Sequence, residues 1–391
     1  MKNLYKIFFI PLVFSLLLFA CIRSEPPNIE ADILECSVPD LPEAVQYGAK
    51  IINPGKGSDR ISIWISADYE VGMLSPEFVL TPGATIFPAS GTALDFSNEQ
   101  EQKYIVTSEN GQWKKEYTVV VRPRFILVAD KDGDGKSKSF HFENYQKYDG
   151  NYNFQQFYEE SLLGKKDFIW GSGNLGFALT NANAPAENYP TYATKEGKNG
   201  SAVRLVTRST GAFGAMVKMP IAAGNLFLGS FEIAQALSAP LQATRFGVPY
   251  MMGEPLEINF WYKFQGGTYK DKDGVEQQDF PSIYAVLFEP EVIAGEPVLL
   301  DGANVRTASN ILSIADLDLE PAQVISSDNI ETAGFSYGSI QFVSRKAIDA
   351  QKLANGDYYI TVVFASSKRG DYFEGFVGNT LIVDEVTLIT K

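Results

Sequence analysis

The chain has 391 residues and is rich in Gly, Phe, Pro and Tyr, with 33, 27, 20 and 19 of each, which favours two domains of short strands and turns over helices. The formal net charge of −14 excludes a nucleic-acid-binding protein, because phosphate recognition needs clustered Lys and Arg. A single histidine excludes a multi-histidine zinc site. We therefore expect an all-β protein, and a neutral, hydroxyl-rich ligand is compatible with its acidity.

Residues 1–20 are expected to be a secretory signal. Met1–Lys6 is basic, and the apolar run Ile7–Ala20 is shorter than the roughly 20 residues that span a bilayer as a helix. The sequence from Leu18 to Cys21 resembles the lipobox of bacterial lipoproteins, in which the cysteine is lipidated and becomes the first mature residue. The resemblance implies lipidation at Cys21 and a membrane partner, whereas an ordinary cleaved signal is the alternative.

The residues after the cysteine bear on its destination. Ile22 and Arg23 follow it without an Asp, a pattern that resembles lipoproteins sorted to the outer membrane. Residues 21–32, with Pro26 and Pro27, are expected to be an extended tether. With Cys21 lipidated, Cys36 has no disulfide partner, so the fold must be held by its core alone.

Residues 33–123 are predicted to form a small β-sandwich. Short apolar strands alternate with turn sequences, and Asn110-Gly111 is the clearest hairpin signal. This part resembles the immunoglobulin-like spacers of bacterial surface lipoproteins, which implies a spacer role. Trp64 and Trp113 are assigned to core or cross-strand packing rather than to a ligand platform.

Residues 124–391 form the second predicted domain. Near its start, Asp130–Lys136 has the acidic spacing of a calcium loop, but the twelfth position is His141 instead of a bidentate Glu. We expect an acidic turn between the domains there, and no catalytic role for His141. Residues 295–331 read as a long polar excursion that either carries little regular structure or decorates one edge of the fold.

The middle of this domain carries aromatic and amide side chains. Trp170 to Asn174 forms a Gly-rich aromatic loop. In the strand Leu256–Phe264, alternation places Asn259, Trp261 and Lys263 on one side. Rings stack on the apolar face of a pyranose while amides and cations bind its hydroxyls, so a sugar contact is one interpretation and a solvent-facing or inter-sheet side is the other.

The C-terminal quarter is expected to lie inside a sandwich. Two β-branched strands flank a polar loop, and alternation in the second strand sets Ile382, Asp384, Val386 and Leu388 on one face. Asp384 would then be partly buried. Its carboxyl group is a candidate general acid, calcium ligand or hydrogen-bond acceptor. Glu143 and Asp384 are the candidate ligands of a structural calcium ion.

A series of motifs in this domain resembles the putative carbohydrate metabolism domain family of gut bacterial lipoproteins. The resemblance covers about Phe140 to Ile389 and implies a jelly-roll-like sandwich with a role in glycan use, without known catalytic residues. The matching segments are Trp170–Asn174, Ser201–Thr207, Ala223–Phe231, Phe246–Pro249, Phe260–Lys263, Ala365–Asp371 and Leu381–Val386.

Three functions remain open at this point. We expect a surface lipoprotein that binds a polysaccharide or oligosaccharide, with an outer-membrane glycan-uptake system as a further candidate partner. An adhesion subunit that contacts a protein is one alternative. A glycoside hydrolase is the other, with two carboxylates about 5–10 Å apart, drawn from Glu143, Asp279, Asp371, Glu374, Asp384 and Glu385. The expected glycan contacts are Trp170, Asn174, Trp261, Lys263, Lys368, Asp371 and Tyr372.

Overall fold

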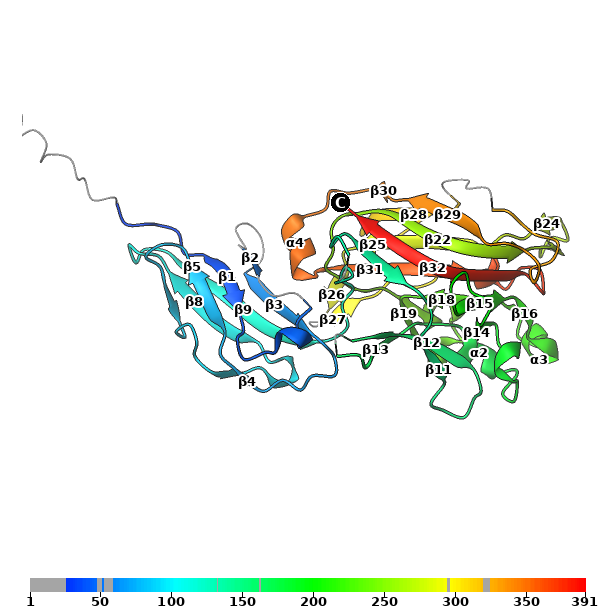
Figure 1. Ribbon diagram of the computed structural model, residues 1–391, viewed down its shortest axis with the longest axis horizontal. Helices are drawn as coiled ribbons and strands as arrows, with labels where there is room; N and C mark the ends of the chain where they lie inside the picture. The colour runs from blue at the N-terminus through cyan, green and yellow to red at the C-terminus, as the bar shows by residue number, and fades with distance from the viewer. Residues whose placement is uncertain are drawn as a thin grey trace, which may run out of the picture.

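The computed structural model describes residues 26–47, 51–52, 59–131, 133–161, 163–293, 296–318 and 324–391. Cys21, the predicted signal, part of the tether and Asp132 lie outside these residues. Two β modules lie one after the other along the long axis (Figure 1), and the prediction of an all-β protein is confirmed. In the described part of the chain, no helix combines the length and apolarity needed to cross a membrane.

The first module is an immunoglobulin-like sandwich of short sheets. One sheet has the order β2-β1-β5 and a second the order β3-β9-β8-β6, in which β3 runs parallel to β9. The hairpin predicted at Asn110-Gly111 joins β8 to β9, with Gly111 at φ 70°. The strands are β1 (Ile33–Ser37), β2 (Ile51–Ile52), β3 (Arg60–Ile65), β4 (Met73–Leu74), β5 (Glu77–Leu80), β6 (Thr85–Phe87), β7 (Leu94–Asp95), β8 (Gln102–Thr107) and β9 (Lys114–Pro123).

The two tryptophans of this module differ. Trp64 is 4% exposed, which confirms its packing role, and its indole N–H donates to the carbonyl of Asn355 in the second module at 2.9 Å. Trp113 is 60% exposed, so its assignment to packing was wrong. It precedes Lys114, the first residue of β9, and so lies in the turn of the hairpin.

Further contacts join the modules. The Asp167 carboxylate of the second module accepts hydrogen bonds from the Tyr47 hydroxyl and, at 3.3 Å, from the Ala67 N–H. Lys165 pairs with Asp68 at 3.4 Å. Together with Trp64, these contacts pack the end of β3 against the second module.

The second module is a larger, jelly-roll-like sandwich of two six-stranded sheets (Figure 1). One sheet has the order β14-β15-β32-β22-β29 with β10 on β32, and the other β18-β31-β25-β28-β30 with β21 on β31. Their facing sides share one core that includes Leu205, Phe260, Val383, Ile283 and Phe364.

The elements of this module are mostly short. Its helices are α2 (Asn174–Ala178), α3 (Gly211–Met216) and α4 (Ala350–Asn355). Its strands are β10 (Ser137–Phe140), β11 (Tyr145–Lys147), β12 (Gln155–Glu160), β13 (Lys166–Ile169), β14 (Thr191–Thr194), β15 (Ala202–Val206), β16 (Arg208–Ser209), β17 (Ile221–Ala222), β18 (Asn225–Phe227), β19 (Gly229–Phe231), β20 (Thr244–Phe246), β21 (Val248–Tyr250), β22 (Pro255–Gln265), β23 (Thr268–Lys270), β24 (Glu276–Gln278), β25 (Ser282–Phe288), β26 (Glu291–Ile293), β27 (Glu296–Val298), β28 (Ile311–Asp316), β29 (Ser336–Gln341), β30 (Val343–Ser344), β31 (Tyr358–Ala365) and β32 (Thr380–Thr390).

The alternation predicted for β32 fails after Asp384. The register of β32 against β22 shifts between Asn259 and Trp261, and Glu385 has φ 48°, so β32 carries one extra residue there. The bulge reverses the alternation, and Leu381 and Val383 share the core with Val386 and Leu388. Asp384 therefore points to the opposite face from Val386, contrary to the prediction.

Candidate functional site

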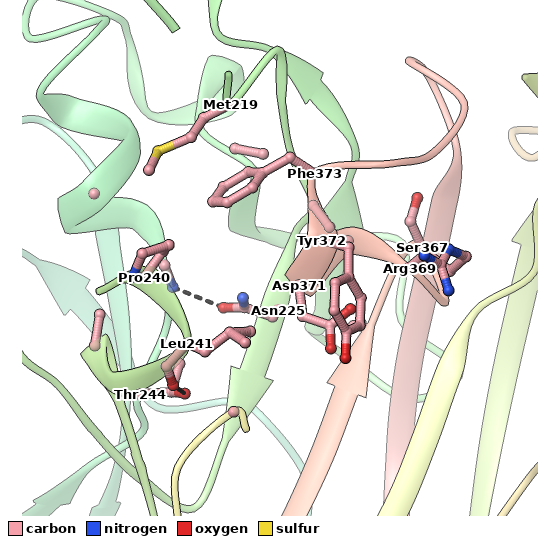
Figure 2. Close-up of a pocket in the computed structure, with 18 of the residues that line it drawn as sticks. Met219, Asn225, Pro240, Leu241, Thr244, Ser367, Arg369, Asp371, Tyr372 and Phe373 are labelled. Carbon is pink, nitrogen blue, oxygen red and sulfur yellow. Dashed lines mark hydrogen bonds between the residues drawn. The ribbon is translucent and has the colours of Figure 1, made fainter. Parts of the chain in front are cut away.

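A cavity of about 420 Å³ opens in the second module. Its walls come from α2, α3, the 3₁₀ helix Pro240–Ala243, the start of β18 and the loop that follows β31. Figure 2 shows Met219, Leu241 and the ring of Phe373 on the left, with the polar Asn225 and Thr244 near Leu241. Ser367 and Arg369 lie on the right, and Asp371 and Tyr372 lie between the two groups.

The polar side is built on the loop 366–373, which a buried carboxylate holds. Asp279 accepts hydrogen bonds from the Ser367 hydroxyl at 2.6 Å and the Phe376 N–H at 2.8 Å. Burial raises the pKa of Asp279, and these donors oppose the rise. The Thr207 hydroxyl lies 2.8 Å from that of Ser366. These hydrogen bonds hold the loop 366–373 in place without a ligand.

Lys368 of this loop lies near Arg306 and two carboxylates from a neighbouring segment of the chain. Arg306 pairs with Asp318 at 3.0 Å and with Asp316 at 3.5 Å, and Lys368 reaches Asp318 at 3.0 Å. The Arg306 guanidinium also lies 4.2 Å from the ring centroid of Tyr284. Arg306, Asp318, Lys368 and Tyr284 all line the cavity, so they offer it charged donors and acceptors in a fixed arrangement.

Asp371 and Tyr372 complete the polar side. Asp371 is exposed as a whole residue, but partial desolvation of its carboxyl raises its pKa, while the nearby Arg306 guanidinium favours its charged form. Tyr372 is exposed, and Arg369 lies 4.9 Å from its ring centroid while pairing with Glu374 at 2.7 Å. Three predicted contacts, Lys368, Asp371 and Tyr372, therefore meet at one cavity.

Two other predicted contacts were wrong because they are buried. Trp170 is 2% exposed, its indole N–H donates to Glu159 at 2.9 Å, and its ring packs edge-on against Phe140. Asn174 is fully buried, and its amide both donates to and accepts from the backbone of Thr191. Neither side chain has a face or a free polar group to offer a ligand.

Trp261 and Lys263 lie on the outer face of β22, away from the cavity. Lys198 lies 3.9 Å from the ring centroid of Trp261, and Tyr337 packs edge-on against the same ring at 5.3 Å. Lys263 lies 4.9 Å from the ring centroid of Phe335. Neither Trp261 nor Lys263 is among the residues that line the cavity. The predicted glycan contacts therefore do not form one site, because Lys368, Asp371 and Tyr372 line the cavity.

Glu143 and Asp384 hold a loop, and the arrangement does not fit a calcium site. Glu143 accepts from the Ser201 N–H at 2.8 Å, and Asp384 from the N–H groups of Asn199 at 3.0 Å and Glu385 at 2.8 Å. Burial raises the pKa of Asp384 to about 6. Within the described residues, no three His, Cys, Asp or Glu side chains gather to hold a metal ion.

A second hollow of about 540 Å³ is lined by several carboxylates, among them Glu143 and Glu385. Three of these acids have partners: Glu385 lies 2.9 Å from Nδ1 of His141, Glu159 accepts from Trp170, and Asp130 pairs with Lys138 at 3.2 Å. Burial raises the pKa of Glu159. These contacts hold together the segments around β10, β12 and β32. The carboxylates therefore have a structural role.

Sequence reasoning missed Arg306 and Asp318. Both fall in the stretch 295–331, which was predicted to carry little regular structure or to decorate one edge, yet β28 lies inside it, between β25 and β30 of a six-stranded sheet. Ile311–Asp316 is a short apolar run, and that run was the available signal. The apolar wall was missed because its residues come from separate short segments.

Two solved structures of Bacteroides proteins are similar to this chain. A crystal structure described as a putative glycoside hydrolase from Bacteroides thetaiotaomicron is 38% identical, with 94% of this chain and 99% of that chain covered and a TM-score of 0.60. Another, described in the same words and from Bacteroides vulgatus, is 33% identical, with coverage of 68% and 100% and a TM-score of 0.57. None of the curated proteins compared matches the chain.

Family models match both modules. A model of the N-terminal domain of surface glycan-binding proteins matches residues 46–121. The model described as a putative carbohydrate metabolism domain matches residues 141–389, which is more than half of the chain. The chain therefore belongs to the putative carbohydrate metabolism domain family.

Proposed function

We propose that this chain is a cell-surface lipoprotein that binds a glycan in the cavity of its second module without cleaving it. The observation that carries the proposal is the convergence of Lys368, Asp371, Tyr372 and Arg306 on one open cavity. Charged groups and a ring in a preformed cavity suit a ligand rich in hydroxyls. The match of residues 46–121 to surface glycan-binding proteins supports the same conclusion.

Binding is favoured over cleavage by the state of the carboxylates. Asp318 and Asp371 are the carboxylates among the described residues that line the cavity. Asp318 is paired with both Arg306 and Lys368, so its oxygens already have cationic partners. A group engaged in this way positions neighbouring cations and is poorly placed to activate water.

Hydrolysis is the second candidate, and one feature favours it. Partial desolvation raises the pKa of Asp371, as a general acid requires, and Asp318 would then act as base or nucleophile. The relative from Bacteroides thetaiotaomicron carries the description of a putative glycoside hydrolase.

A glycan array followed by assay of reducing ends separates the two candidates. We expect the full chain to retain a polysaccharide and to release no new reducing ends from it. If new ends accumulate, and Asp371→Asn and Asp318→Asn each abolish them, the protein is a hydrolase. If no glycan on the array is retained, the binding proposal fails.

The anchoring is also part of the proposal. Lipid at Cys21 would hold the protein at the outer membrane, with residues 33–123 as a spacer and residues 124–391 presented to glycans and to an uptake system. We expect Cys21→Ser to lose incorporation of radiolabelled palmitate and to leave the membrane fraction. Unchanged labelling in this variant would contradict lipidation at Cys21.

A further inference from the structure

Apolar side chains also line the cavity and form what we call its apolar wall. They are Leu179, Val217, Met219, Phe231, Leu237 and Phe373. Several of these come from separate short segments: Leu179 follows α2, Val217 and Met219 follow α3, and Leu237 precedes the 3₁₀ helix Pro240–Ala243. Figure 2 shows Met219 and the Phe373 ring together, apart from Arg369.

This wall includes apolar side chains that remain in contact with water. Leu237 is 51% exposed and Leu179 is 38% exposed. Just beside the cavity, Phe213 and Met216 on α3 are exposed as well. Exposed apolar side chains gathered around a hollow mark a binding site, because covering them is favourable.

A saccharide without an apolar substituent would make few favourable contacts with this apolar wall. Sugar hydroxyls pressed against Leu, Val and Met side chains lose their hydrogen bonds to water and gain none in return, which is costly. Flat rings can stack on a pyranose, but most of the wall is aliphatic. The hydroxyl groups of a sugar find hydrogen-bonding partners in Lys368, Arg306 and Asp371.

The wall is also preformed. The Thr210 hydroxyl donates to the carbonyl of Met219 and so closes the turn after α3. Gly214 leaves room for this contact, since a Cβ there would lie 2.0 Å from Oγ1 of Thr210. Asn225 accepts from the Gly173 N–H at 2.7 Å and fixes the start of α2. A fixed wall needs little ordering when a ligand binds.

We propose that the ligand of this cavity is a saccharide that carries an apolar acyl or aryl substituent. The sugar lies against Lys368, Arg306 and Asp371, and the substituent lies against Leu237, Leu179 and Met219. This inference rests on the proposed function, because it names the class of glycan that the same cavity binds.

Titration of the full chain with paired phenyl and methyl β-glycosides of glucose, galactose, xylose, mannose and N-acetylglucosamine tests the proposal. For at least one sugar, we expect the phenyl glycoside to bind tenfold or more tightly than the methyl glycoside, since burial of a ring is worth at least that factor. Leu237→Asn and Leu179→Asn should each reduce the preference to less than threefold. The exposed Leu256 lies outside the cavity, so Leu256→Asn should leave the preference unchanged.

Each outcome has a definite meaning. If no phenyl glycoside binds more tightly than its methyl counterpart, the inference is overturned, while retention of a plain glycan that depends on Lys368 and Asp371 would leave the proposed function standing. If phenol alone binds as tightly as every phenyl glycoside, the sugar contributes nothing, and the proposed function falls as well. Both leucines are partly exposed, and circular dichroism verifies that their variants fold.

Discussion

Asp279 and Glu374 both hold the loop 366–376, but they differ in burial. Asp279 is buried and accepts from Ser367, Phe376 and, at 3.4 Å, from Lys368. Glu374 makes a single ion pair with Arg369, whose side chain is 44% exposed. Buried acceptors are costly to remove, whereas surface ion pairs contribute little. At the residue scale, Asp279 is therefore the more important support of the site.

Asp279→Ala should lower the free energy of unfolding by about 1–3 kcal/mol and weaken glycan binding at least tenfold, because donors lose their acceptor and the loop loses its support. Glu374→Ala should cost less than about 1 kcal/mol. Urea unfolding and glycan titration of the two variants check this difference. Equal losses in both would show that burial of Asp279 does not govern the loop.

The raised pKa of Asp384 predicts that the free energy of unfolding depends on pH. Its pKa in the folded chain is about 6, above the ordinary value of 3.8, because burial disfavours the charged form. The folded state therefore binds the proton of Asp384 more tightly than the unfolded state does. Asp384 makes its full contribution to the free energy of unfolding below about pH 4, and this contribution is lost as the pH rises through 6. Between pH 4 and 7 this loss is about 1–3 kcal/mol.

Asp384→Asn should remove this contribution, since an amide does not titrate there. We expect the free energy of unfolding of the wild type, measured against that of Asp384→Asn, to fall by that amount from pH 4 to pH 7. Urea titrations at four pH values give the comparison. Parallel curves for the two proteins would contradict the raised pKa.

At the scale of elements, the bulge in β32 decides which side chains reach the core. Val386 and Leu388 are fully buried beside Leu381 and Val383, whereas Ile389 is half-buried on the other face. A strict alternation would place Asp384 on the core side with Val386. The extra residue at Asp384 and Glu385 removes that conflict.

Leu388→Ala should therefore cost about 2–5 kcal/mol, as for a filled core position. Ile389→Ala should cost clearly less, because that side chain is only partly covered. Chemical denaturation of both variants measures the difference. A larger loss for Ile389→Ala would contradict the register of β32.

Local patterns predicted much of the fold and less of the site. The alternation of β22 was read correctly, with Ile258, Phe260, Tyr262 and Phe264 buried. The bulge in β32 was not, because a backbone with positive φ at Glu385 leaves no mark in an apolar run. Asn174 and Trp170 were misread because composition shows that a ring or amide is present, but not which backbone or carboxylate already binds it.

At the scale of the whole molecule, the two modules share a packed interface. Trp64 is buried at its centre, with Gly356 so close that a Cβ there would lie 2.8 Å from the indole nitrogen. The Arg122 guanidinium lies 5.6 Å from the centroid of the same ring. The contacts of Trp64 with Asn355 and Gly356 join the first module to the second, whereas Arg122 holds the ring from within the first module.

Trp64→Ala should uncouple the modules. We expect calorimetry to show two separated unfolding transitions in place of a more cooperative one, because the indole and its hydrogen bond to Asn355 are lost. Trp113→Ala is the matched control, since that ring is exposed. An unchanged thermogram for Trp64→Ala would argue that the modules unfold independently already.

The central claim is that the cavity, and not the outer face of β22, binds the glycan. Isothermal titration of the full chain with the polysaccharide retained on the array tests it most directly. We predict that Lys368→Ala and Asp371→Asn weaken binding at least tenfold, that Trp261→Ala changes it less than twofold, and that the recovered polysaccharide keeps its length. Loss of binding in Trp261→Ala with no effect of the cavity variants, or release of shorter chains, would contradict the account.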